Sequence, residues 1–239
     1  MFPGRTCLLA LLFAMQSTSA LCAAPAINTV PVAPWTFPKE PARGIAPEYL
    51  RYLFKTANID VVLGTLPYGR VINGLRDGSN LAALLIPDAE RDAFALRLCT
   101  VTSIRSGILY KKSRFPQLSL DRLSGLTIGE QRGTHALDKL STTGANIHTI
   151  DSIEQGLKML VLDRLDATFV SSPGSDIVLI DNGLEPKEYG WFEVDVAPVV
   201  VYISRKAALA ADRAALTRLR SVCEGSGQAV MKALMLKYR

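Results

Sequence analysis

The chain has 239 residues, of which 49% are apolar and 21% are charged, so it can build one large core or two modest ones. This composition excludes intrinsic disorder, because disordered chains carry few apolar residues and a high net charge. The formal net charge of +5 is compatible with an anionic small ligand. It is too small to indicate nucleic-acid binding, which is usually accompanied by clusters of Lys and Arg.

Residues 1–23 have the features of a secretory signal peptide. Arg5 is the positively charged start, residues 9–15 form a short apolar core, and small residues near 18–23 provide a cleavage site. That core is too short to persist as a membrane-spanning helix, and no later stretch approaches about 20 uninterrupted apolar residues. Cys22 suggests a lipid anchor, but Leu21 precedes it where a small residue is needed. We therefore expect a soluble, exported protein, with the signal peptide removed.

Short apolar runs and helically spaced apolar residues alternate in the first part of the mature chain. The predicted elements are strands at 29–34, 59–63 and 81–86 and helices at 46–56 and 70–76. The helix at 46–56 would bury Tyr49, Leu50, Leu53 and Phe54. Alternation of this kind is typical of a doubly wound α/β sheet.

A second α/β pattern follows residue 110. Its predicted elements are strands at 127–129, 147–150 and 165–170 and helices at 133–140 and 152–160, the latter capped by Asp151 or Ser152. Two apolar stretches, at about 103–109 and 198–203, flank this region and have the character of strands. The segment 207–238 is predicted to be helical, with an interruption at 224–227.

The stretch 75–91 carries the strongest functional signal. Gly78 lies in a turn after a predicted helix, where glycine is free to adopt a positive φ. The continuous apolar run 81–86 is expected to be a strand covered on both faces. Pro87 ends it, and Arg91 then falls past the carboxyl end of the strand, where open α/β sheets bind ligands. A guanidinium there can hold a carboxylate through two hydrogen bonds.

Three segments of the chain resemble one known family. They are Pro87-Asp88-Ala89-Glu90-Arg91 with Asn80 before it, Leu123–Gly129 followed by Arg132-Gly133-Thr134, and Asp163–Ala167. In this order they are similar to the type II periplasmic solute-binding proteins of the amino-acid-binding class (bacterial extracellular solute-binding family 3), over residues 28–239. Asn80 stands where that family usually has Asp.

The resemblance implies a fold of two doubly wound α/β lobes joined by two hinge strands, with a cleft between them. It assigns 24–104 and 203–239 to lobe I and 105–202, including the hinge strands, to lobe II. It also implies a monomeric periplasmic protein that captures a ligand by hinge closure and delivers it to the membrane permease of an ABC transporter.

In lobe I the resemblance implies three ligand-binding residues. Arg91 would hold the carboxylate of the ligand, and Tyr68 would stack on the ligand. Trp35 would form part of the cleft wall. A partly exposed loop tyrosine and a core tryptophan remain alternative interpretations of Tyr68 and Trp35.

In lobe II the candidate residues are Gly133, Thr134, His135 and Ser171. A helix beginning at Gly133 would present unpaired N–H groups and a partial positive charge to an anion. His135 lies at the same helix start and is either a ligand contact or a surface imidazole. Ser171 stands where the amino-acid-binding family has the Asp that takes the ammonium group of the ligand.

Other departures also bear on the ligand. Leu84 and Ile86 occupy positions where the family usually has small or hydroxylic residues. With Ser171, they indicate a cleft that has cationic donors and no anionic acceptor. Since an unpartnered buried ammonium is costly, we expect a ligand with a carboxylate and no free ammonium. Three nearby acids could still reach an ammonium: Glu48, Glu90 and Asp176.

Two cysteines, Cys99 and Cys223, remain after removal of the signal peptide. The resemblance assigns both to lobe I, and export makes a disulfide between them possible, so we expect them to pair. The alternative is two small buried apolar residues. With His135 and His148 as the only histidines and no Cys-x-x-Cys, no metal site or cofactor is expected.

Three function classes remain open. Ligand capture for uptake is the first, and a periplasmic sensor or receptor domain that is not tied to transport is the second. The third is a dehydratase-like enzyme on the same fold. The sequence contains no nucleophile elbow, zinc motif, P-loop or dinucleotide fingerprint, and the missing cleft acids argue against acid–base catalysis. We therefore expect a binding protein rather than an enzyme.

Overall fold

The computed structural model describes residues 24–132, 140, 142–172, 174–207, 209 and 212–238. The predicted signal peptide and the predicted helix start at Gly133, Thr134 and His135 lie outside these residues. Among the helices in the described part of the chain, none has the length and hydropathy needed to span a membrane.

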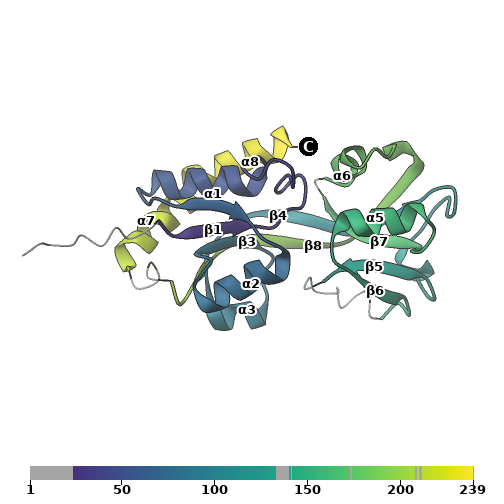
Figure 1. The fold of residues 1–239 in the computed structure, drawn as a ribbon, viewed down its shortest axis with the longest axis horizontal. Helices are drawn as coiled ribbons and strands as arrows, with labels where there is room; N and C mark the ends of the chain where they lie inside the picture. The colour runs from purple at the N-terminus through teal and green to yellow at the C-terminus, as the bar shows by residue number, and fades with distance from the viewer. Residues whose placement is uncertain are drawn as a thin grey trace, which may run out of the picture.

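A six-stranded mixed sheet runs through the molecule. Its order is β3-β8-β4-β7-β5-β6, and a separate parallel pair is formed by β1 and β2. The strands are β1 (Ala26–Thr29), β2 (Val62–Thr65), β3 (Ala82–Leu85), β4 (Ala95–Lys111), β5 (Thr127–Gln131), β6 (Asn146–Ile150), β7 (Ala167–Ser172) and β8 (Tyr189–Ser204). β4 and β8 pair antiparallel from one end to the other and join two lobes (Figure 1).

Helices cover the sheet in both lobes. In lobe I, α1 and α8 lie on one side of the strands, and α2 and α3 lie on the other (Figure 1). The helices are α1 (Ile45–Thr56), α2 (Tyr68–Asp77), α3 (Ala89–Phe94), α5 (Ile153–Val161), α6 (Ser175–Asp181), α7 (Arg213–Glu224) and α8 (Ser226–Lys237), with short 3-10 helices at Leu120–Arg122 and Pro186–Glu188.

The largest core belongs to lobe I. It packs α1, α7 and α8 against the strands, and the four α1 residues predicted to be buried, Tyr49, Leu50, Leu53 and Phe54, are all fully buried in it. Cys99 on β4 and Cys223 on α7 form a disulfide with a Cα–Cα distance of 6.4 Å, which confirms the predicted pairing. A second cluster, which includes Val71, Leu75 and Tyr202, covers the opposite face of β3 and β8.

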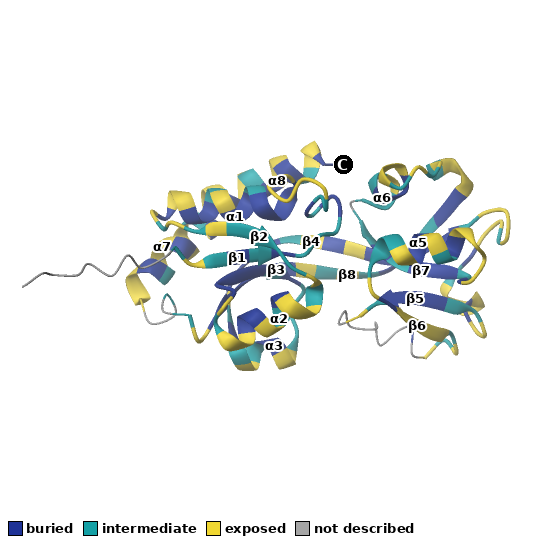
Figure 2. Cartoon of the chain, viewed as in Figure 1, coloured by how far each residue is buried: buried dark blue, intermediate teal, exposed yellow. Residues whose placement is uncertain are grey.

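Lobe II has two smaller cores on opposite faces of its strands. Ile108 packs with Leu123 and Ile128, whereas its neighbour Leu109 packs with Leu157 on α5. This division follows from strand geometry, because successive side chains point to opposite faces. The edge strand β6 is exposed along most of its length (Figure 2).

The segment 75–91 folds as the sequence predicts. Gly78 is the left-handed C-cap of α2, with φ 93°, and β3 is covered on both faces. Asn80 is buried, and its amide accepts a hydrogen bond from the Asn28 N–H (2.6 Å) and donates to the Asn28 and Ala82 carbonyls (both 3.3 Å). An Asp carboxylate could not donate those bonds, so Asn is the better residue for tying β1 to β3 here.

Several predicted boundaries were wrong. The strand expected at 29–34 lies earlier, at Ala26–Thr29, because Pro31 and Pro34 lack the N–H needed for a ladder. The strand expected at 59–63 lies at Val62–Thr65, where its partner β1 pairs with it. The C-terminal helical segment begins at Arg213, after the Asp212 side chain caps the helix, rather than near residue 207.

Candidate functional site

A cavity of about 570 Å³ lies between the lobes and is mostly apolar. Lobe I contributes the segment after β1 and the turn from β3 into α3, and lobe II contributes the ends of β5 and β7 and the start of α5. The two shared strands β4 and β8 also line it. Its principal polar side chains are Asn28, Thr29, Tyr68, Asp88, Arg91, Ser106, Gln131, Ser171 and Asp195.

Arg91 lies on the short helix α3 and is only 6% exposed. Its guanidinium donates one hydrogen bond from Nη1 to the Ile86 carbonyl and one from Nη2 to the Tyr68 hydroxyl, each 2.5 Å long. A guanidinium carries five N–H donors, so these bonds orient Arg91 and leave donors for a ligand in the cavity.

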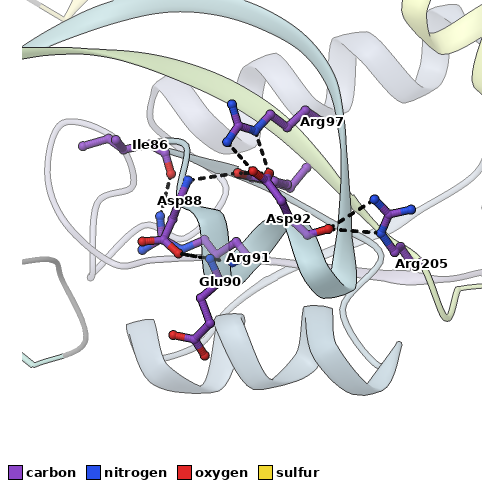
Figure 3. A network of polar contacts seen from close by, with 8 residues as sticks. Ile86, Asp88, Glu90, Arg91, Asp92, Arg97 and Arg205 are labelled. Atoms are coloured by element: carbon purple, nitrogen blue, oxygen red, sulfur yellow. Dashed lines mark hydrogen bonds and ion pairs between the residues drawn. The ribbon is translucent and has the colours of Figure 1, made fainter.

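The helix that carries Arg91 is held at both ends. The Asp88 carboxylate caps its first turn by accepting from the Glu90 N–H (2.7 Å) and the Arg91 N–H (3.2 Å) (Figure 3). The Tyr202 hydroxyl on β8 accepts from the Asp88 N–H (3.2 Å) and donates to the Asp92 carboxylate (2.9 Å). α3 is therefore fixed to β8 of the sheet.

Asp92, on the same helix, makes further contacts with two arginines. Its carboxylate accepts hydrogen bonds from Nε and Nη2 of Arg97, and its backbone carbonyl accepts hydrogen bonds from Nε and Nη2 of Arg205 (Figure 3). The hydrogen bonds from Arg97 lower the pKa of Asp92, so the carboxylate stays ionised at neutral pH. These contacts keep α3, and with it Arg91, in one orientation.

Tyr68 opens α2 and faces Arg91. Burial raises the pKa of the Tyr68 hydroxyl, and the nearby Arg91 charge offsets this only in part. The hydroxyl is therefore neutral at physiological pH and keeps a proton. It can accept from Arg91 and donate to an anion in the cavity at the same time.

The wall on the lobe II side is built from strand positions that share one register. Ser106 on β4 pairs with Ser171 on β7, and their hydroxyls are 3.3 Å apart. Ser106 also pairs with Asp195 on β8, on its other side. Directly paired residues project to the same face of a sheet, so these three side chains form one row along the cavity.

No metal cluster is formed by the described side chains, since nowhere among them do three His, Cys, Asp or Glu residues come together as metal ligands could.

Comparison with known proteins identifies the fold. No protein-family model and no curated protein matches the sequence. Solved structures do match. The periplasmic VFT2 domain of Bordetella pertussis BvgS has a TM-score of 0.73 at 16% identity, over 90% of this chain and 93% of that one. The substrate-binding protein of an amino acid ABC transporter has a TM-score of 0.71 at 17% identity, over 89% and 98%.

A third match is the GluR0 ligand-binding core from Nostoc punctiforme in complex with L-glutamate, with a TM-score of 0.71 at 15% identity, over 90% of this chain and 98% of that one. All three matches span nearly the whole of both chains. This chain has the type II periplasmic binding protein fold. The family resemblance predicted from the sequence is confirmed at the level of fold, and two of these neighbours are a substrate-binding protein and a ligand-binding core.

Within this type II fold, four of the predicted site residues lie on the same cavity: Trp35, Tyr68, Arg91 and Ser171. Trp35 also packs against the lobe I core, so it belongs to both cleft wall and core. Gly133, Thr134 and His135 lie outside the described residues. The segment Asp163–Ala167, the third of those that resemble the family, has a structural role. The Asp166 carboxylate accepts a hydrogen bond from the Thr127 N–H (2.7 Å) and forms an ion pair with Arg114 (2.5 Å).

The prediction that the cleft has no acid was wrong. Asp88 and Asp195 both line the cavity. The three acids considered from the sequence are not among its lining residues: Glu90 pairs with Arg76 at 2.6 Å, Glu48 pairs with Lys237 at 2.8 Å, and Asp176 lies in the first turn of α6. Asp195 was missed because only the β4–β8 register brings it beside Ser106. Its alternation with Val199 and Ala197 along one strand was the available signal.

Proposed function

We propose that this protein is a periplasmic solute-binding protein that captures a small carboxylate-bearing ligand in the interlobe cleft, with Arg91 as the carboxylate anchor. Tyr68, Trp35 and Ser171 would contact the ligand, together with Gly133, Thr134 and His135 from lobe II. No cofactor or catalytic step is part of this proposal. The protein would act as an exported monomer, with lobe I at 24–104 and 203–239 and lobe II at 105–202.

The observation that carries the proposal is the state of Arg91. Arg91 is almost completely buried, and among the described residues its guanidinium donates to two neutral oxygens, the Ile86 carbonyl and the Tyr68 hydroxyl. A buried cation is favoured by a counter-charge and by filled donor positions. A ligand carboxylate would supply both, because its two oxygens match the planar fork of a guanidinium.

Uptake is the preferred role, with a membrane permease as the partner that receives the ligand. The likeness to the substrate-binding protein of an amino acid ABC transporter supports it. The likeness to the GluR0 ligand-binding core favours a second candidate, a ligand sensor that acts without a transporter. Finding whether the loaded protein stimulates a transport ATPase in proteoliposomes would separate the two roles.

Thermal denaturation of the mature protein with a panel of monocarboxylates, dicarboxylates and amino acids tests the binding function. A ligand at about 100 times its Kd stabilises the folded state by about 2.7 kcal/mol. For a chain of this size, that corresponds to a rise in Tm of roughly 5–10 °C. Arg91→Ala should abolish the rise, and Arg91→Lys should reduce it, since Lys keeps the charge but loses the bidentate fork.

Arg105→Ala is the matched control. Arg105 lies on β4 beside the cavity row, but its side chain is 57% exposed and pairs with Glu193, so this variant should bind as the wild type does. Circular dichroism would establish that each variant is folded. An Arg91→Ala protein that is folded and keeps the wild-type rise in Tm would contradict the assignment of Arg91 as anchor.

A further inference from the structure

One face of β8 forms a stripe of three residues along the interlobe cavity. This stripe consists of Val199, Ala197 and Asp195, which occupy every second position of the strand, and all three line the cavity. Residues two apart on a strand share a face, so the stripe runs from an apolar end at Val199 to a carboxylate at Asp195. Ile104 and Ser106 on β4 pair with Ala197 and Asp195 and repeat the same order, apolar then polar.

Arg91 is held at the apolar end of this stripe. Its guanidinium donates to the Ile86 carbonyl, and Ile86 follows Leu85, which pairs with Val200 on β8. Ile86 is therefore level with Val199. Asp195 lies four residues further along the same strand, a distance of roughly 13 Å between backbones at about 3.3 Å per residue.

The two cavity acids have different surroundings. Asp88 uses its carboxylate to cap the helix of Arg91, through the Glu90 and Arg91 N–H groups. Asp195 lies on β8 and pairs with Ser106, next to a shift in the β4–β8 register. An ionised carboxylate has about four acceptor positions, so Asp195 can receive a ligand donor alongside contacts within the protein.

From this arrangement, we propose that the cleft selects zwitterions whose carboxylate and cationic nitrogen lie at opposite ends of an apolar chain. Arg91 would bind the carboxylate and Asp195 the nitrogen, with the chain over Val199 and Ala197. Two charges on a single carbon could not reach both groups, because the two anchors are separated along the strand. Asp195 is thus a specificity-determining residue.

Four matched compounds test this assignment by isothermal titration calorimetry. 6-Aminohexanoate has separated charges, norleucine is its isomer with both charges on one carbon, hexanoate lacks the nitrogen and hexylamine lacks the carboxylate. The wild-type protein should bind 6-aminohexanoate at least 10-fold more tightly than any of the other three. Asp195→Asn should remove that advantage and leave the affinity for hexanoate unchanged.

Asp176→Asn is the control, since it removes one acidic charge from lobe II at a residue that does not line the cavity. It should retain the preference for 6-aminohexanoate. Tighter binding of norleucine, or equal binding of 6-aminohexanoate by wild type and Asp195→Asn, would overturn the inference.

Because this assignment rests on the proposed carboxylate capture, the two can fail separately. If hexanoate and 6-aminohexanoate bind equally, and both depend on Arg91, carboxylate capture stands and the role of Asp195 falls. If none of the four compounds binds at millimolar concentration, the assignment of Asp195 to this ligand class is rejected, and the Arg91 panel alone decides the proposed function.

Discussion

The two lobes bury their interiors in different ways. Lobe I packs three helices against one face of the sheet in a large core that holds the Cys99–Cys223 disulfide, and a much smaller cluster covers the other face of β3 and β8. Lobe II divides its apolar side chains between two smaller cores, on either side of Ile108 and Leu109. Four of the five residues of its edge strand β6 are exposed, whereas β3 of lobe I is almost entirely buried (Figure 2).

The two lobes also contribute different groups to the cavity. Arg91 belongs to the lobe with the larger core, and its helix is held by the Asp88 cap and by hydrogen bonds between Tyr202 on β8 and the helix residues Asp88 and Asp92. The opposing row of Ser171, Ser106 and Asp195 crosses the strands shared with lobe II. The proposed anchor, Arg91, is thus held by several contacts within lobe I, and the residues proposed to discriminate between ligands lie on or beside the strands that join the lobes.

Removing the disulfide should have the largest effect on this comparison. Cys99 and Cys223 are 124 residues apart, and loss of a native bridge closing a loop of this size costs roughly 2–5 kcal/mol. The Cys99→Ala, Cys223→Ala double variant should therefore unfold at a clearly lower urea concentration than the wild type. Reduction of the wild type should have a similar effect. Equal urea midpoints for oxidised and reduced protein would show that lobe I does not depend on the bridge.

Gly107→Ala should destabilise the lobe II side of the shared strands. A Cβ at this position would lie 2.2 Å from the Phe192 carbonyl oxygen and 2.6 Å from the Trp191 ring, so β4 and β8 must separate to admit it. Overpacking of this kind typically costs 1–3 kcal/mol. Urea unfolding measures the loss, and hydrogen exchange should show it concentrated in lobe II.

Gly69→Ala provides the contrast in lobe I. Gly69 lies in α2, and a Cβ there meets no atom within 4 Å. Alanine is the better helix former, so this variant should be neutral or stabilised by up to about 1 kcal/mol. Equal destabilisation by both substitutions would mean that the close approach at Gly107 does not govern its cost.

The smallest expected effect concerns Glu48 in lobe I. Burial acts to raise the pKa of Glu48, but hydrogen bonds from Lys237, Tyr238 and the Gly44 N–H outweigh it and lower the pKa below its ordinary value of 4.5. The folded state therefore binds fewer protons, and Glu48 stabilises it above about pH 4.5. This contribution is lost as the pH falls through the lowered pKa.

Glu48→Gln should accordingly cost less than about 1 kcal/mol at pH 7, because the Lys237 side chain of this ion pair is more than half exposed, and it should cost less at pH 3 than at pH 7. Urea midpoints at the two pH values measure the difference. Glu40→Gln is the control, because both side chains of the Glu40–Arg43 pair are at least half exposed and this substitution should have little effect at either pH. A Glu48→Gln loss that is equal at pH 7 and pH 3 would contradict a role for the carboxylate charge.

The sequence by itself determined those features that depend on neighbours along the chain. The spacing of Tyr49, Leu53 and Phe54 specified the buried face of α1, and Gly78 marked the end of α2, since helix periodicity and positive φ are local properties. The strand that ends before Arg91 was likewise predicted from a short apolar run. Arg91 could therefore be predicted to lie past the carboxyl end of that strand, and it does line the cavity.

Only the tertiary structure decided which residues meet across strands. The position of β1 depends on pairing with β2, which is distant in sequence. The apolar residues after Thr29 therefore led to a predicted strand at 29–34, although the prolines there do not suit a strand. Asp195 stands beside Ser106 and Ser171 through the registers of three strands that lie far apart in the chain. A register shift of one residue would turn Asp195 to the other face, because side chains alternate with period two. Cross-strand register is set by the packing of the whole sheet, and it is this that brings a carboxylate into the cleft.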